Sequence, residues 1–155
     1  MDKQKKELRI LEMMAENEKT ISQLYKTYSE KFPDYEDFWF GLSAQEIEHA
    51  TWLYELSSKV EDGFVHFRKD RFDINNIKKF HDYVNYILNH AQKQEISLES
   101  ALVNALSIEY NLIERKFFEV FKGDAEELKL VLKLLYTSTS EHRNRVKKAF
   151  DEITQ

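Results

Sequence analysis

The chain has 155 residues, a length that fits one domain with a continuous core. It contains no cysteine, which excludes disulfides, thiolate zinc sites, cysteine-held iron–sulfur clusters and cysteine nucleophiles, so any metal must be held by oxygen and imidazole nitrogen. The net charge of -5 and the pI near 5.6 argue against nucleic-acid binding.

The composition predicts long amphipathic helices with few turns. Only 3 residues are glycine and 1 is proline, and the 33% of charged residues are interleaved with the 42% of hydrophobic ones. No apolar run approaches the roughly 20 residues that cross a bilayer. We therefore expect an all-α protein that does not enter a membrane and lies in the cytoplasm.

The first half of the chain contains two predicted long helices and one shorter one. The first helix runs from about residue 3 to 31, because Pro33 disfavours helix at Phe32 and leaves Asp34 to cap the next helix. The second runs to about residue 60 and stops near "EDG". Residues 61–73 are typical of a connection, and Asp73 can cap a shorter helix over residues 74–93.

Two more long helices are predicted after residue 96. Ser97 can cap the first of them, which we expect to end at Gly123 in a left-handed C-cap. Asp124 followed by Glu127 resembles a capping box that opens the last helix, which continues to about residue 153. This order predicts a four-helix bundle made of two helix hairpins, joined by a long crossover that contains the short helix.

Each long helix has a polar interruption near the middle of its predicted buried stripe. The stripe of the second helix, for example, reads Leu42, Glu46, His49, Leu53, Leu56 and Val60. The residues that interrupt the four stripes are, in chain order, Glu18, Glu46 with His49, Glu109, and His142. Four interruptions at matching heights in an apolar core predict one shared polar site.

A bound metal explains these interruptions better than hydrogen bonding alone. A buried carboxylate costs several kcal/mol unless a partner neutralises it, and three converging carboxylates would repel one another. Carboxylate and imidazole suit iron and manganese. The fourth helix does not repeat the Glu-x-x-His spacing of Glu46 and His49, because the residue three before His142 is Thr139. Glu141 is adjacent to His142 and therefore points about 100° away around the helix. Glu48, beside His49, is expected to face away for the same reason.

The chain resembles the rubrerythrin-like branch of the ferritin-like superfamily over nearly its whole length. The resemblance rests on "ENEKTISQLY", "FWFGLSAQEIEHATWL", "SLESALVNALSIEYNLIERKFFEVF" and "TSTSEHRNRV". It implies a single ferritin-like domain over residues 1–155 and a two-iron carboxylate centre, with manganese or zinc as other candidate metals. The ligands it implies are Glu18, Glu46, His49, Glu109 and His142, with Tyr25 as a hydrogen-bond donor to a ligand. Thr139 stands where the family pattern has a carboxylate.

The resemblance also implies an activity and partners. Members of this family reduce hydrogen peroxide to water with electrons from a small redox protein, and dioxygen is the other candidate oxidant. Classical rubrerythrins carry a four-cysteine rubredoxin module, which this chain lacks, so the resemblance implies a separate electron-donor protein. Pairing of two chains into a homodimer is a further expectation from the resemblance. Of the candidate ligands, Glu46 and Glu109 are the ones we expect to bridge two ions.

Two alternatives stay open at this point. The chain can be a degenerate bundle with one ion or none that serves as a structural or interaction module, and Thr139 favours that hypothesis. Cage-type iron storage is a further alternative, although nothing in the sequence indicates shell-forming contacts. The remaining histidines are interpreted as surface or packing residues; these are His66, His81 and His90.

Overall fold

The computed structural model describes residues 2–64, 74–112 and 126–155, and these residues form an all-helical structure without strands. The predictions made for His66, Asp73, Gly123 and Asp124 concern positions outside the described residues. The α-helices of the described part, in chain order, are α1 (Lys3–Lys31), α2 (Glu36–Glu61), α3 (Ile74–Lys93), α4 (Leu98–Asn111) and α6 (Glu126–Ile153).

α1 and α2 form an antiparallel hairpin joined by a short 3-10 helix, η1 (Pro33–Tyr35). The predicted break at Phe32 is confirmed, because its φ of -123° and ψ of 78° lie outside the helical region. The predicted cap at Asp34 is wrong. Pro33 opens the 3-10 turn, so Asp34 lies within it and Tyr35 takes the cap position of α2 without a side-chain hydrogen bond.

The cap at the start of α4 is confirmed, and the predicted end of that helix is wrong. The Ser97 side chain accepts a hydrogen bond from the Ser100 N–H at 3.1 Å. α4 ends at Asn111 rather than at Gly123, because Leu112 adopts an extended backbone with φ of -59° and ψ of 131°. The side-chain amide of Asn111 donates to the Ser107 carbonyl at 2.8 Å, a local bond typical of residues that end helices.

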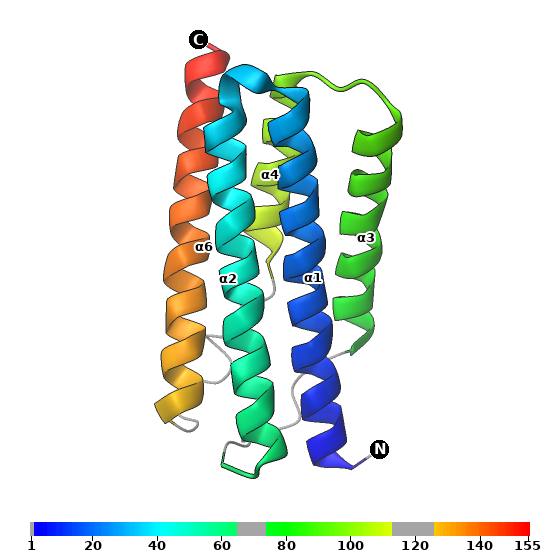
Figure 1. Ribbon diagram of the computed structural model, residues 1–155, viewed down its shortest axis with the longest axis vertical. Coiled ribbons are helices and arrows are strands. Elements are labelled where there is room, and N and C mark those ends of the chain that lie inside the picture. The colour runs from blue at the N-terminus through cyan, green and yellow to red at the C-terminus, as the bar shows by residue number, and fades with distance from the viewer. Residues whose placement is uncertain (1, 65–73, 113–125) are drawn as a thin grey trace.

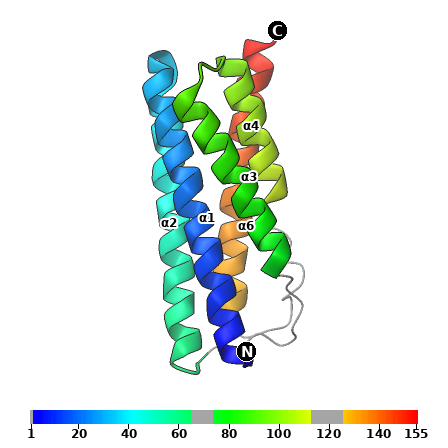
Figure 2. The same ribbon diagram turned by 90° about the vertical axis from the view of Figure 1, so that its right-hand side faces the viewer.

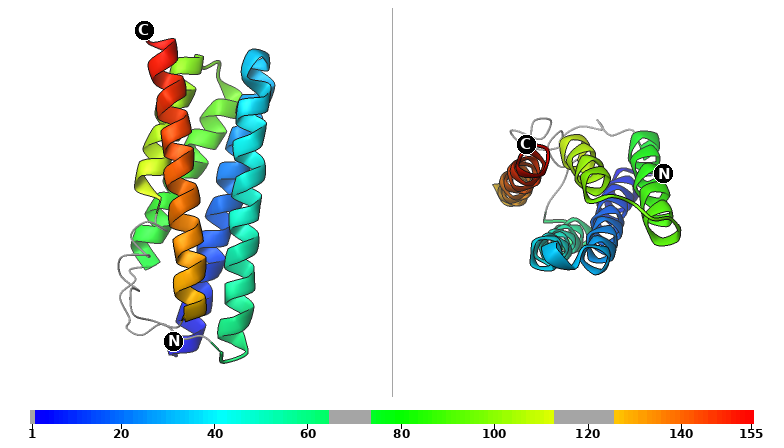
Figure 3. Two further views of the ribbon diagram at one scale, coloured as in Figure 1. Left: turned by 90° about the vertical axis from the view of Figure 1, so that its left-hand side faces the viewer. Right: turned by 90° about the horizontal axis from the view of Figure 1, so that it is seen from above.

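Helices α1, α2, α4 and α6 run roughly parallel to one axis, and α3 lies beside them. α2 lies between α6 and α1, and α3 covers the side of α1 that is away from α2 (Figures 1 and 2). Seen from above, α4 sits across from the α1–α2 hairpin and next to α6 (Figure 3). None of the described helices is long and apolar enough to cross a membrane.

The apolar core of the described residues is divided into two clusters along this axis. The cluster nearer to the α1–α2 turn includes Trp39, Leu42 and Leu102, and the other includes Leu11, Leu53 and Leu135. On α1, α2 and α6 the buried polar residues of the predicted stripes lie between the two clusters in the sequence, as Glu18 lies between Ala15 and Ile21. The two clusters therefore enclose one polar layer.

Candidate metal centre

The polar layer consists of five buried residues from four helices, which we call the carboxylate–histidine cluster. Each of the five is between 0% and 1% exposed. They are Glu18 from α1, Glu46 and His49 from α2, Glu109 from α4, and His142 from α6. The sequence therefore identified all five positions as buried, and the structure brings them together.

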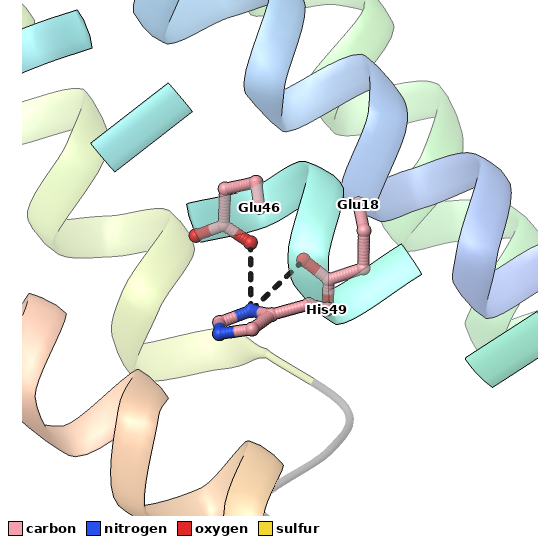
Figure 4. A group of neighbouring side chains, drawn as sticks. All are labelled: Glu18, Glu46 and His49. Carbon is pink, nitrogen blue, oxygen red and sulfur yellow. Dashed lines mark hydrogen bonds and ion pairs between the residues drawn. The ribbon is translucent and has the colours of Figure 1, made fainter. Parts of the chain in front are cut away.

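The first half of the cluster is Glu18, Glu46 and His49. His49 Nδ1 lies 3.1 Å from Glu46 Oε2 and 3.7 Å from Glu18 Oε2 (Figure 4). The other ring nitrogen, Nε2, lies 2.6 Å from Ser138 Oγ of α6. The Trp52 ring stacks on the imidazole with centroids 5.4 Å apart. His49 is thus held at both nitrogens and on one ring face.

The second half of the cluster is Glu46, Glu109 and His142. His142 Nδ1 lies 2.9 Å from Glu46 Oε1 and 3.6 Å from Glu109 Oε1. The Tyr25 hydroxyl of α1 donates to Glu109 Oε1 at 2.7 Å. Among the described residues, Glu109 Oε2 and His142 Nε2 have no hydrogen-bond partner. Glu46 is the one residue that belongs to both halves, with a different oxygen facing each histidine.

A pair of serines holds α1 against α2 next to the cluster. Ser22 follows Glu18 by about one turn of α1, and Ser43 precedes Glu46 by about one turn of α2. Each serine hydroxyl donates to the backbone carbonyl of the other residue at 2.8 Å. Because serine is small, the two helix backbones approach closely there, and this contact fixes the register in which Glu18 meets Glu46.

Electrostatics holds the protonated histidines between the carboxylates. Burial alone would lower the pKa of His49, but Glu46 and Glu18 raise it to about 11. Burial acts on His142 in the same direction, and its bonds with Glu109 and Glu46 raise its pKa to about 9. Burial disfavours the charge on Glu46, yet His49 lowers its pKa to about 2. The two imidazolium groups therefore stabilise the negative charge of Glu46 in the metal-free protein.

The phenol of Tyr25 remains a donor in this environment. Burial, followed by the charges of Glu109 and Glu46, raises the pKa of Tyr25 well above 10. A neutral phenol can only orient its proton toward Glu109 Oε1. Tyr25 therefore contacts a candidate ligand, as predicted, and that ligand lies on α4.

The donor set fits a metal centre. Each half of the cluster offers three ligand atoms, and within each half these atoms lie within 4.8 Å of one another. Both halves combine carboxylate oxygen with imidazole nitrogen, the donors that iron, manganese and zinc accept. Glu109 Oε2 is buried without a partner in the described part of the chain, an atom that a cation would satisfy. The cluster can hold a metal ion, and its geometry does not identify which one.

Other residues singled out in the sequence lie outside the cluster. Glu48 and Glu141 are exposed, as their helical positions predicted. His81 lies between Asn17 Oδ1 at 2.7 Å and Asn85 Nδ2 at 2.8 Å, and His90 stacks on Tyr86. These contacts are the packing roles that the sequence indicated.

One predicted role stays a prediction, and one contact was not predicted. Glu109 is expected to bridge together with Glu46, and of the two groups of candidate ligand atoms it belongs to the second. Ser138, which contacts His49, was not identified at all. It lies beside the predicted buried stripe of its helix, and its contact depends on how α6 docks against α2, for which the sequence spacing gives no signal.

Comparison with known proteins adds no identification. No family model, no curated protein and no solved structure matches this chain.

Proposed function

We propose that this chain is a ferritin-like metalloprotein of the rubrerythrin type, whose carboxylate–histidine cluster binds two metal ions and reduces hydrogen peroxide or dioxygen. The observation that carries this proposal is the convergence of three carboxylates and two imidazoles from four helices in a layer at most 1% exposed. The arrangement of α1, α2, α4 and α6 supports the ferritin-like four-helix bundle as its fold.

The energetic argument for metal is the cost of the cluster without one. Burying three carboxylates and two charged imidazoles costs several kcal/mol per ion before their mutual attraction is counted. An apolar layer of similar volume would be at least as stable, so the polar layer is better explained by a ligand than by stability. Divalent cations supply the charge that the carboxylates need, and the imidazoles then bind as neutral donors.

The residues would divide the work as follows. Glu46 would contribute to both ions, since its two oxygens face the two histidines. Glu18 with His49 would hold one ion and Glu109 with His142 the other, while the Tyr25 hydroxyl orients Glu109. Two ferrous ions bound there would supply the two electrons which, with two protons, convert one hydrogen peroxide into two waters.

Iron is the proposed metal, and the electrons would come from a separate donor protein. The oxygen and nitrogen donors accept iron, and iron changes its oxidation state, whereas zinc does not. The chain has no cysteine with which to bind a rubredoxin-type iron or an iron–sulfur cluster. An external donor must therefore return the two iron ions to the ferrous state after each turnover.

One observation favours a second candidate function, a structural module with one ion or none. Thr139 occupies the α6 position that matches Glu46 of α2, three residues before a cluster histidine. The cluster therefore has five protein ligands where a symmetric arrangement would have six. A bundle that had lost metal binding would retain only the packing role of these helices.

Metal stoichiometry separates the two functions. Wild-type protein, His49→Ala and Glu48→Gln are incubated anaerobically with ferrous iron, desalted and analysed for iron per chain. The proposal expects about two irons in wild type and in Glu48→Gln, whose exposed carboxylate lies beside the cluster histidine, and a loss in His49→Ala. If the three proteins contained the same amount of iron per chain, or if none contained iron, the structural module would be the supported function.

A further inference from the structure

The side chain of Thr139 is an unbonded polar group in the layer of the cluster. It lies on α6, is 0% exposed, and its Oγ1 has no hydrogen-bond partner among the described residues. A buried hydroxyl without a partner costs about 1–3 kcal/mol, so it calls for an explanation.

Neighbouring residues on α6 place Thr139 beside both halves of the cluster. Ser138 Oγ contacts His49 Nε2 at 2.6 Å, and His142 Nδ1 contacts Glu46 Oε1 at 2.9 Å. Thr139 lies between these two contacts along the helix and three residues before His142, on the same face. It therefore has the relation to His142 that Glu46 has to His49.

The hydrogen bonding of Thr139 also differs from that of three other threonines in the helices. Thr20, Thr27 and Thr51 donate to the carbonyl four residues earlier, at 3.0, 2.9 and 3.1 Å. Thr139 makes no such bond in the described structure, although an exposed-face threonine does so readily. Its hydroxyl thus remains available to a group that the protein itself does not provide.

The charge of a loaded cluster identifies the class of that group. Three carboxylates carry three negative charges, and both histidines are neutral when they bind metal. Two divalent ions carry four positive charges, so one positive charge is left in a layer at most 1% exposed. An uncompensated buried charge is costly, and a monovalent anion removes it.

We propose that Thr139 forms part of a binding site for a small monovalent carboxylate, which enters with the metal ions and replaces the side-chain carboxylate that α6 lacks. The Thr139 hydroxyl donates a hydrogen bond to the anion. This inference rests on the proposed function, since it requires two bound ions. Hydroxide drawn from water would balance the same charge, and the experiment below separates the two anions.

The test is a calorimetric titration with Mn²⁺, which resists oxidation in air better than ferrous iron, in the presence of formate or of chloride at equal ionic strength. Wild type, Thr139→Val and Thr139→Glu are compared, and Thr137→Val, an exposed threonine on the same helix, is the matched control. Thr139→Val keeps the shape of the side chain, so it remains informative if Thr139→Glu does not fold.

The expected result is that formate raises the affinity of wild type and of Thr137→Val for the second ion by about 5–150-fold, the usual range of coupling between two bound ligands. Thr139→Val is expected to bind the ions, but formate should raise its affinity for the second ion by a several times smaller factor than in wild type. Thr139→Glu binds two ions without formate and does not respond to it. Weak binding of formate to free Mn²⁺ acts against the expected increase, so it cannot produce it.

Two outcomes would overturn the inference in different ways. If wild type binds two ions with the same affinity in formate and chloride, the carboxylate site is wrong, hydroxide balances the charge, and the proposed function stands. If none of the four proteins binds Mn²⁺ or ferrous iron, the proposed function fails together with the inference.

Discussion

The two halves of the carboxylate–histidine cluster are built alike but supported differently. In the first half, His49 contacts Glu46 through one nitrogen and Ser138 through the other, and Trp52 stacks on its ring. In the second half, His142 contacts Glu46 through Nδ1, while its Nε2 has no partner in the described structure.

The two halves also differ in chain connectivity. Both carboxylates and the histidine of the first half come from α1 and α2, which are neighbours in the sequence and are tied together by the bonds between Ser22 and Ser43. The second half needs α4 and α6, which dock from outside that hairpin (Figure 3). The comparison indicates that the first half is the more preorganised of the two candidate metal sites.

The largest expected effect is that of Glu46→Ala, because Glu46 alone belongs to both halves. We expect both ions to be lost, with a fall in affinity beyond the roughly 10–100-fold that follows from removing only an outer hydrogen-bond partner. Glu18→Ala and Glu109→Ala should each lower the affinity for one of the two ions. Elemental analysis after anaerobic loading measures all three variants, and retention of two ions by Glu46→Ala would contradict the shared role.

The next largest effect is the dependence of the stability of the metal-free protein on pH. The pKa values of His49 and His142 are raised from 6.5 to about 11 and about 9, so their contribution to stability is complete below pH 6.5 and declines as pH rises through these values. Each proton that the folded protein retains and the unfolded chain has lost changes the free energy of unfolding by about 1.4 kcal/mol per pH unit. From pH 6.5 to 9 both histidines contribute to the decline, and above pH 9 His49 alone does.

Urea unfolding of metal-free protein between pH 6.5 and 9.5 measures this decline in the free energy of unfolding. His142→Gln should reduce the slope by about half in that range, because the contribution of the second half is then absent. The acid side is governed by Glu46, whose lowered pKa of about 2 means that its contribution is lost as pH falls below 4.5. If the free energy of unfolding of wild type did not change above pH 6.5, His49 and His142 would not both be protonated in the folded metal-free protein.

The smallest expected effect is that of Ser138→Ala, which removes the hydrogen-bond partner of His49 Nε2. The affinity for the first ion should fall about tenfold, because the ring loses the acceptor that fixes its orientation. Ser140→Ala is the control, since the Ser140 hydroxyl is buried without a partner in the described structure. Equal affinities in the two variants would mean that the first half needs no support from α6.

The positions of the cluster residues could be predicted because helical periodicity is a local property. The stripe through Leu42, Glu46 and His49 follows from the 3.6-residue repeat, and all three side chains are buried. The same repeat identified Glu109 and His142. Their relative distances could not be predicted, since these depend on how the helices dock.

Two errors in the fold have the same local cause. The apolar repeat continues beyond Asn111, so the sequence carried no signal for the end of α4. Asp34 has the composition of a cap, but Pro33 placed it inside a 3-10 turn. In both cases the residue types at the predicted helix end are compatible with more than one backbone conformation.

The chain has two tryptophans, and each lies next to a different half of the cluster. Trp52 stacks on His49 with ring centroids 5.4 Å apart, and Trp39 lies 5.6 Å from Tyr25, which holds Glu109. Indole fluorescence is quenched by paramagnetic ions at short range. The protein therefore carries two intrinsic optical reporters, and the emission of Trp39→Phe and Trp52→Phe variants would follow the filling of each half in real time.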